Sequence, residues 1–153
     1  MEFSIDSSIS NNSLRFSKPE PEYVTVHLSG VVSASARVCT YTDETGISNW
    51  LNKLASFSKP WKSAIVWQSL ENQFSVSATC SSLGEVRLSF QLSDMHGHPE
   101  EWQVTSNIIT DLGQLPVLAK LSGAFFQSCM HLTKKLSHSL RSLGRIHVGC
   151  SAL

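Results

Sequence analysis

The chain has 153 residues, of which 41% are hydrophobic and 16% are charged, and its formal net charge is zero. This length and composition predict one soluble globular domain and exclude a strongly charged or low-complexity chain. No apolar run approaches the length of a membrane-spanning helix, and no apolar signal segment opens the sequence. We therefore expect a cytoplasmic protein that does not enter membranes.

The charged residues are unevenly distributed along the chain. Residues 1–127 contain all twelve acids and eight of the twelve Lys and Arg residues, so their net charge is −4. Residues 128–153 contain four basic residues and no acid, so their net charge is +4. Four charges are few for a nucleic-acid-binding surface, and we expect no nucleic-acid partner.

The four cysteines, Cys39, Cys80, Cys129 and Cys150, lie far apart, and none forms a CxxC pair. The spacing typical of metal ligands is therefore missing. Cys39 and Cys80 fall inside strand patterns, where a reduced cysteine behaves as a small buried hydrophobic residue. These observations predict free thiols, no metal site and no cofactor.

The first third of the chain contains three segments with different patterns of apolar residues. Residues 1–21 are polar and end in SKPEPE, whose prolines oppose regular structure, so we expect a flexible N-terminal arm with at most a short strand at 14–16. Residues 22–28 and 31–42 alternate apolar and polar side chains around a Ser-Gly turn, which predicts a β-hairpin. At 45–57 the apolar spacing becomes that of an amphipathic helix. The apolar positions of this helix are Ile47, Trp50, Leu51, Leu54 and Phe57.

The segment 63–109 alternates strictly and predicts a four-stranded antiparallel meander. Its first turn would have Glu71 and Asn72 as the two central residues, since asparagine tolerates the positive φ of a tight hairpin. This register pairs Trp67 with Val76 on the apolar face. A slip of one residue would instead place Trp67 on the serine-rich face, so the pattern specifies one register.

Helical spacing returns at 111–126, and a further amphipathic helix is expected in the basic segment 128–153. The order ββα-ββββ-α predicts an α+β two-layer fold, with one antiparallel meander of about six strands and helices packed on one face. The single α+β domain would span 22–127. The opposite face of the sheet would be polar and free to meet water, a ligand or a partner. Its side chains would come from Thr25, His27, Ser35, Arg37, Ser75, Ser77, Thr79, Arg87, Ser89, Gln91, Gln103 and Thr105.

Several short motifs occur in a fixed order. They are WQSLEN at 67–72, FSVSAT at 74–79, GEVRLSFQL at 84–92, EW at 101–102 and FF at 125–126. This order resembles a family of small uncharacterised bacterial proteins with a W-x-S-L-E-G hairpin motif, and the resemblance covers roughly residues 22–127.

The sequence departs from this family pattern at two positions. Asn72 stands where glycine is usual, which keeps the turn chemistry, and Glu85 stands where histidine is usual. A role for that family histidine therefore cannot be carried over to this chain. The resemblance implies a fold and no activity.

The tryptophans provide one candidate site. Trp50, Trp61, Trp67 and Trp102 could line a small-molecule pocket between the helix and the sheet, with Glu71 as its polar group. The alternative is that the tryptophans are core residues and that Glu71 is exposed at a hairpin tip. The sequence favours the second interpretation for Trp67 and Glu71.

Two other groups of polar residues carry weaker signals. His96, His98, Glu100 and Glu101 offer metal-binding side chains, but a Gly/Pro-rich loop gives them no fixed geometry, so a solvated loop is favoured. His131 and His138, with two lysines, form a basic helix face, for which a solvated surface is again favoured over phosphate binding. We assign no catalytic residue, because no nucleophile elbow and no phosphate-binding glycine loop is present.

Three functions follow in order of support. The first is a non-enzymatic protein-interaction module that binds a partner, as an immunity or accessory factor does, or associates with itself as a homo-oligomer through its sheet. The second is a small-molecule-binding domain with the tryptophan-lined pocket. The third is an enzyme that uses Glu71 or the His96/His98 loop.

Overall fold

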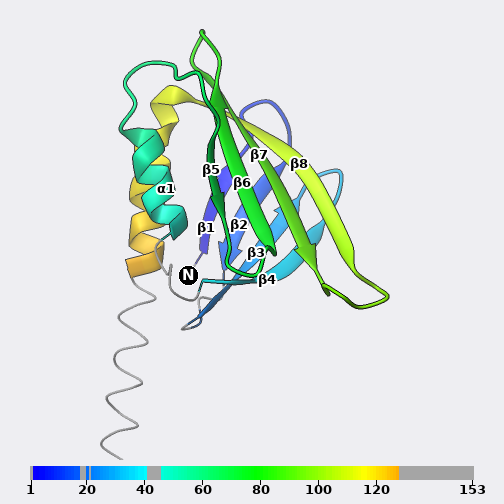
Figure 1. Ribbon diagram of the computed structural model, residues 1–153. Coiled ribbons are helices and arrows are strands. Elements are labelled where there is room, and N and C mark those ends of the chain that lie inside the picture. Colours follow the sequence, from blue (N-terminus) through cyan, green and yellow to red (C-terminus); the bar gives the residue numbers. More distant parts are fainter. Residues whose placement is uncertain (1, 18–19, 21, 41–45, 128–153) are drawn as a thin grey trace, which may run out of the picture.

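A computed structural model describes residues 2–17, 20, 22–40 and 46–127, and it contains two four-stranded antiparallel sheets (Figure 1). The N-terminal sheet consists, in order, of β1 (Glu2–Asp6), β2 (Ser13–Ser17), β3 (Tyr23–Ser29) and β4 (Ala34–Cys39). Helix α1 (Gly46–Ala55) follows. The C-terminal sheet consists, in order, of β5 (Ile65–Gln68), β6 (Phe74–Cys80), β7 (Glu85–Asp94) and β8 (Trp102–Asp111). The 3₁₀ helix η1 (Leu112–Gln114) leads into a second α-helix over 115–127.

The α+β class with antiparallel sheets is confirmed, but the prediction of one six-stranded sheet in the order ββα-ββββ-α is wrong. The structure divides eight strands between two sheets, because residues 2–17, predicted to be a flexible arm, form β1 and β2. Their apolar residues Phe3, Ile5, Leu14 and Phe16 alternate and are all buried. These strands are only five residues long, so each shows a single apolar pair, too few to stand out from the polar residues around them.

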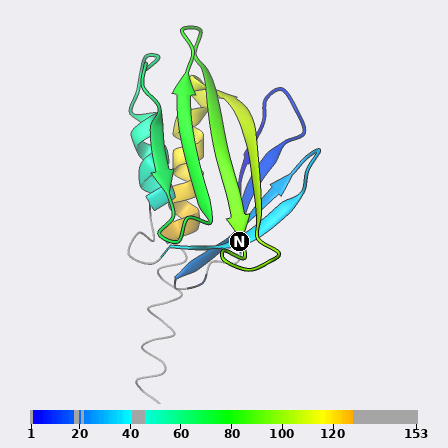
Figure 2. The same ribbon diagram turned by 45° about the vertical axis from the view of Figure 1, so that its right-hand side comes forward.

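The two sheets are joined at two corners. At the first, the turn between β1 and β2 lies along the edge of β8, where the Ser8 amide donates to the Ile109 carbonyl at 2.8 Å. At the second, the Cys39 amide of β4 donates to the side chain of Gln73 at 3.3 Å, and the Ser93 amide of β7 donates to the Gln73 carbonyl at 2.8 Å. Figure 2 shows the resulting inclined arrangement of the sheets, with the helices beside them.

One continuous core fills the space between the inner faces of the sheets and the helices. Phe74, which is 1% exposed, lies at its centre. Its ring centroid lies 5.9 Å from that of Phe16 in the other sheet, 6.4 Å from Phe90 and 6.1 Å from Trp67. Aromatic contacts of this kind add to the burial of the rings themselves. The two sheets are therefore packed together and form a single body.

The two helical predictions within the described residues are confirmed. Helix α1 buries the predicted apolar side, and the later helix buries its own apolar side against the same core. The buried positions of these helices are Ile47, Trp50, Leu51, Leu54, Leu115, Ala119, Ser122, Phe125 and Phe126. The helix and basic tail predicted for 128–153 lie outside the described residues.

The register of the hairpin between β5 and β6 is confirmed, since Trp67 pairs with Val76. The turn differs in detail from the prediction. The Asn72 amide donates to the Ser69 carbonyl at 3.1 Å, so the turn spans 69–72, and Asn72 takes a positive φ of 61° while Glu71 does not. One asparagine thus supplies the left-handed conformation that the chain reversal needs.

Replacement of Asn72 by alanine is expected to lower the free energy of unfolding by about 1–2 kcal/mol, because alanine lacks the polar side chain that helps asparagine adopt the left-handed conformation and that accepts a hydrogen bond from Gln68 Nε2 at 2.7 Å. Asn72→Gly is the matched variant and should cost less, since glycine adopts positive φ freely. Urea unfolding of the two variants checks this. Equal stability of the alanine and glycine variants would contradict the assigned turn.

Candidate functional site

The outer face of the C-terminal sheet forms an open hollow of about 370 Å³. Strand pairing brings Ser77, Ser89 and Asn107 into one row across β6, β7 and β8, and Ser75, Gln91 and Thr105 into the next row. The hollow is lined by Val66, Ser75, Val76, Ser77, Ser89, Phe90, Gln91, Thr105, Ser106 and Asn107. The polar side chains alternate with core residues along each strand, so the same period-2 pattern that builds the core also builds this surface.

The lining of this hollow contains no charged residue. Ser89 Oγ donates to Asn107 Oδ1 at 2.7 Å, and Ser77 Oγ donates to the Ser89 carbonyl at 3.5 Å. Hydroxyl and amide groups both donate and accept hydrogen bonds, so the surface can match a partner of either polarity. The one exposed apolar side chain in the lining belongs to Val66 on the edge strand β5. This surface is suited to binding through hydrogen bonds and shape, and it offers no acid, base or nucleophile of perturbed character.

Of the four tryptophans of the predicted pocket, Trp50 and Trp61 are buried in the core, and Trp67 and Trp102 are partly buried against it. Trp50 and Trp61 are 5% and 8% exposed, and their indole N–H groups donate to the carbonyls of Ile65 at 3.1 Å and Ala78 at 3.4 Å. Trp67 and Trp102 are half-buried and pack against the core. None of the four lines the hollow on the outer face of the C-terminal sheet or either of the two hollows beside the N-terminal sheet. The tryptophan-lined pocket stays a prediction.

Glu71 lies where the hairpin turn meets the N-terminal sheet, in a hollow of about 280 Å³. The hollow is lined by Glu22, Tyr23, Cys39, Leu70 and Glu71. Gln73 Nε2 donates to the Glu71 carboxylate and so fixes its position. Among the five predicted site residues, Glu71 is therefore the one that lines one of these three surface hollows.

Tyr23 is the aromatic member of this second hollow. The guanidinium of Arg37 lies 3.8 Å above its ring and is also paired with Glu20 at 2.6 Å. The pKa of the Tyr23 phenol is raised, chiefly by the Glu71 carboxylate, and Arg37 opposes this shift. A phenol with a raised pKa stays protonated at neutral pH, so it acts here as a hydrogen-bonding group and not as a base.

The histidine-containing loop after β7 places its side chains apart. His96 Nε2 lies 2.9 Å from Ser93 Oγ, while Glu101 accepts a hydrogen bond from the Gly97 amide at 3.1 Å. Among the described residues, no group of three His, Cys, Asp or Glu side chains could hold a metal ion. No helix within the described ranges is long and apolar enough to cross a membrane.

Together, these features define a small α+β protein of two inclined antiparallel sheets with an open, uncharged polar surface. A family model matches residues 5–129, and its description is Family of unknown function (DUF6228). The chain therefore belongs to this family. The matched stretch begins within β1, so the family domain includes the N-terminal strands. Neither the curated proteins nor the solved structures provide a match to the chain.

Proposed function

We propose that this protein is a non-enzymatic protein-interaction module, and that its contact surface is the outer face of the C-terminal sheet. The observation that carries the proposal is the uncharged, serine-rich lining of the 370 Å³ hollow on that face. The simplest partner is a second copy of the chain, which makes a homodimer. The resemblance to small bacterial proteins and the expected free thiols favour action in a bacterial cytoplasm.

The dimensions of the surface suit a protein partner. The four strands contain 4, 7, 10 and 10 residues, so at about 4.8 Å between strands and 3.4 Å per residue they cover roughly 500 Å², a large part of the ~800 Å² that one partner contributes to a standard interface. A shallow and open surface of this kind encloses a small molecule poorly, whereas ligand pockets bury most of their ligand. The area therefore supports a protein partner over a small ligand.

The chemistry of the surface supports self-association. The hollow itself carries no charge, so two copies of it meet without like-charge repulsion, and hydroxyl and amide groups can pair with their own kind across a twofold axis. Water molecules held in the facing hollows would complete the hydrogen bonds, as they do in many interfaces. Surfaces that bind carbohydrates or nucleic acids commonly offer aromatic rings or cations, and the exposed side chains of this lining include neither.

Replacement of Ser89 by arginine is expected to convert the dimer into a monomer, because Ser89 lies in the middle of the face and two arginines would meet across it. Ser35→Arg is the matched control, since Ser35 is an exposed serine on the outer face of the other sheet. Light scattering over a concentration series gives the mass of each protein. A wild-type protein that stays a strict monomer at high concentration would overturn the homodimer.

A further inference from the structure

The outer face of the N-terminal sheet carries a third hollow, of about 300 Å³. It is lined by Arg15, His27, Leu28, Ser29, Ser33, Ala34 and Ser35. Strand pairing places Arg15, His27 and Ser35 side by side across β2, β3 and β4. A cation, an imidazole and several hydroxyl groups are thus held next to one another by the sheet register.

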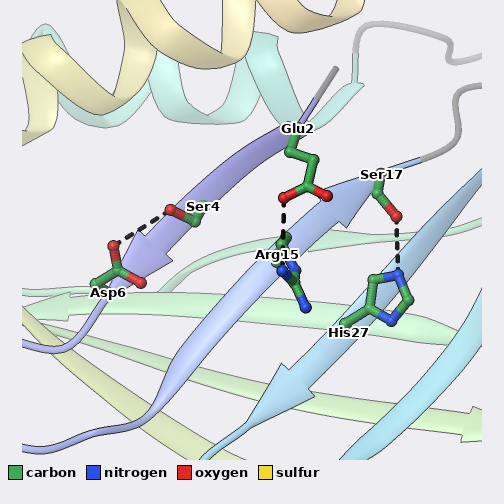
Figure 3. Close-up of polar contacts among 6 residues, drawn as sticks. All are labelled: Glu2, Ser4, Asp6, Arg15, Ser17 and His27. Carbon is green, nitrogen blue, oxygen red and sulfur yellow. Dashed lines mark hydrogen bonds and ion pairs between the residues drawn. The ribbon is translucent and has the colours of Figure 1, made fainter.

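The lining of this hollow contains no acid, in contrast to the face as a whole. The acidic side chains Glu2 and Asp6 lie on β1, on the far side of β2 (Figure 3). Ser4 Oγ donates to the Asp6 carboxylate at 3.2 Å. The acids of the strands themselves thus lie on β1, and Glu20, which precedes β3, is paired with Arg37. The hollow opens over β2 to β4 with Arg15 at its border.

Two contacts hold the central side chains. His27 Nε2 lies 2.8 Å from Ser17 Oγ, which orients the imidazole on the strand (Figure 3). The guanidinium of Arg15 lies 3.5 Å from the Glu2 carboxylate, and both side chains are about half exposed, at 45% and 58%. An exposed ion pair of this kind is weak, so an incoming anion can displace Glu2 from Arg15 at little cost.

We infer that this hollow is a binding site for an oxyanion, namely the phosphate group of a small molecule. Arginine binds phosphate oxygens through two parallel N–H groups, and hydroxyl groups such as those of Ser33 and Ser35 donate to the remaining oxygens. A volume of about 300 Å³ exceeds that of a bare phosphate ion and leaves room for an attached organic part. A nucleic acid fits less well, because one guanidinium and one imidazole cannot follow a series of phosphates.

Binding of inorganic phosphate, measured by isothermal titration at constant ionic strength, tests this inference. Arg15→Gln is expected to weaken phosphate binding by about tenfold or more, since it removes a charge-assisted contact. Glu2→Gln is expected to strengthen binding about two- to fivefold, since it releases Arg15 from its internal partner. Lys53→Gln is the matched control, because Lys53 is an exposed cation on helix α1, away from both outer faces, and it should leave binding unchanged.

Three outcomes would overturn the oxyanion site. They are the absence of wild-type binding up to about 10 mM phosphate, an equal loss of affinity in the Arg15 and Lys53 variants, and equally strong binding of chloride at the same ionic strength. Competition by sulfate would support the site, because sulfate has the same tetrahedral oxygens. Circular dichroism of each variant confirms that the fold is intact, and Arg15→Lys should retain part of the affinity as a point charge.

Discussion

Replacement of Phe74 by alanine is expected to lower the free energy of unfolding by about 3–5 kcal/mol. The Phe74 ring is 1% exposed and contacts rings from both sheets, Phe16 in β2 and Phe90 in β7. Its removal leaves a cavity where the two sheets meet, because the surrounding strands are held by their own hydrogen bonds and cannot collapse into the space. Urea unfolding followed by tryptophan fluorescence measures the change.

Two comparison variants make this prediction specific. Leu83→Ala removes an apolar side chain that is 94% exposed in the turn between β6 and β7, and it should change stability by less than about 0.5 kcal/mol. Phe74→Leu keeps much of the buried volume and should fold even if the alanine variant does not. A Phe74→Ala protein as stable as the Leu83→Ala protein would show that this ring does not join the sheets.

Replacement of Gly30 by alanine is expected to lower the free energy of unfolding by about 2–4 kcal/mol, through an overlap and a strained backbone together. A Cβ atom at this position would overlap Asn12 Oδ1 and lie 3.2 Å from Asn12 Cα, and the φ of Gly30 is +150°. The Asn12 side chain can turn away only by giving up the hydrogen bond from its Nδ2 to the Asn107 carbonyl at 3.4 Å, and its Cα is backbone and stays in place. Gly30 therefore allows the turn between β3 and β4 to approach the corner where the sheets meet.

Gly97→Ala separates the two contributions at Gly30. Gly97 also has a positive φ, of +78°, but a Cβ atom there would meet nothing within 4 Å, so only the conformational cost of about 1–2 kcal/mol is expected. In the double variant Asn12→Ala/Gly30→Ala, the overlap with Oδ1 is removed and part of the loss should be recovered. Additive effects of the two single changes, measured by chemical denaturation, would contradict the close approach.

The sequence specified the C-terminal sheet well. Strands β6 and β7 are seven and ten residues long, and their strict alternation defines the buried face and the register with Trp67 opposite Val76. Helix α1 was equally clear, because four of the five predicted apolar positions lie in it and are buried, whereas the fifth, Phe57, follows the end of the helix at Ala55 and is partly buried. Each of these elements carries enough apolar residues for its period to be recognised within its own length.

The division into two sheets was not predictable in the same way. Strands β1 and β2 are short, and the separation of β4 from β5 depends on which edges meet in space. The joining contacts link distant residues, such as Ser8 to Ile109 and Cys39 to Gln73. Hydrogen bonds between residues so far apart in sequence leave no periodic signal, so a meander of six strands and two sheets of four look alike from the sequence.

The residues of the candidate sites were likewise predicted only in part. The polar outer positions were predicted from alternation, and Ser75, Ser77, Ser89, Gln91 and Thr105 do line one hollow. The sequence, however, placed the polar residues of both sheets on one surface, whereas the structure separates Arg15, His27 and Ser35 from them on another. Arg15 was missed as a site residue because it lies in β2, within the segment expected to be flexible.

By itself, the sequence determined which side chains of α1 and of the C-terminal sheet enter the core, because alternation and helical spacing are local properties of the chain. It also determined the register of the hairpin between β5 and β6, although not the residues at the centre of its turn. Only the tertiary structure decided that there are two sheets and that their polar outer faces form chemically distinct hollows. Those features depend on contacts between residues remote in sequence, such as Phe16 with Phe74, and such contacts form only when the whole chain packs around one core.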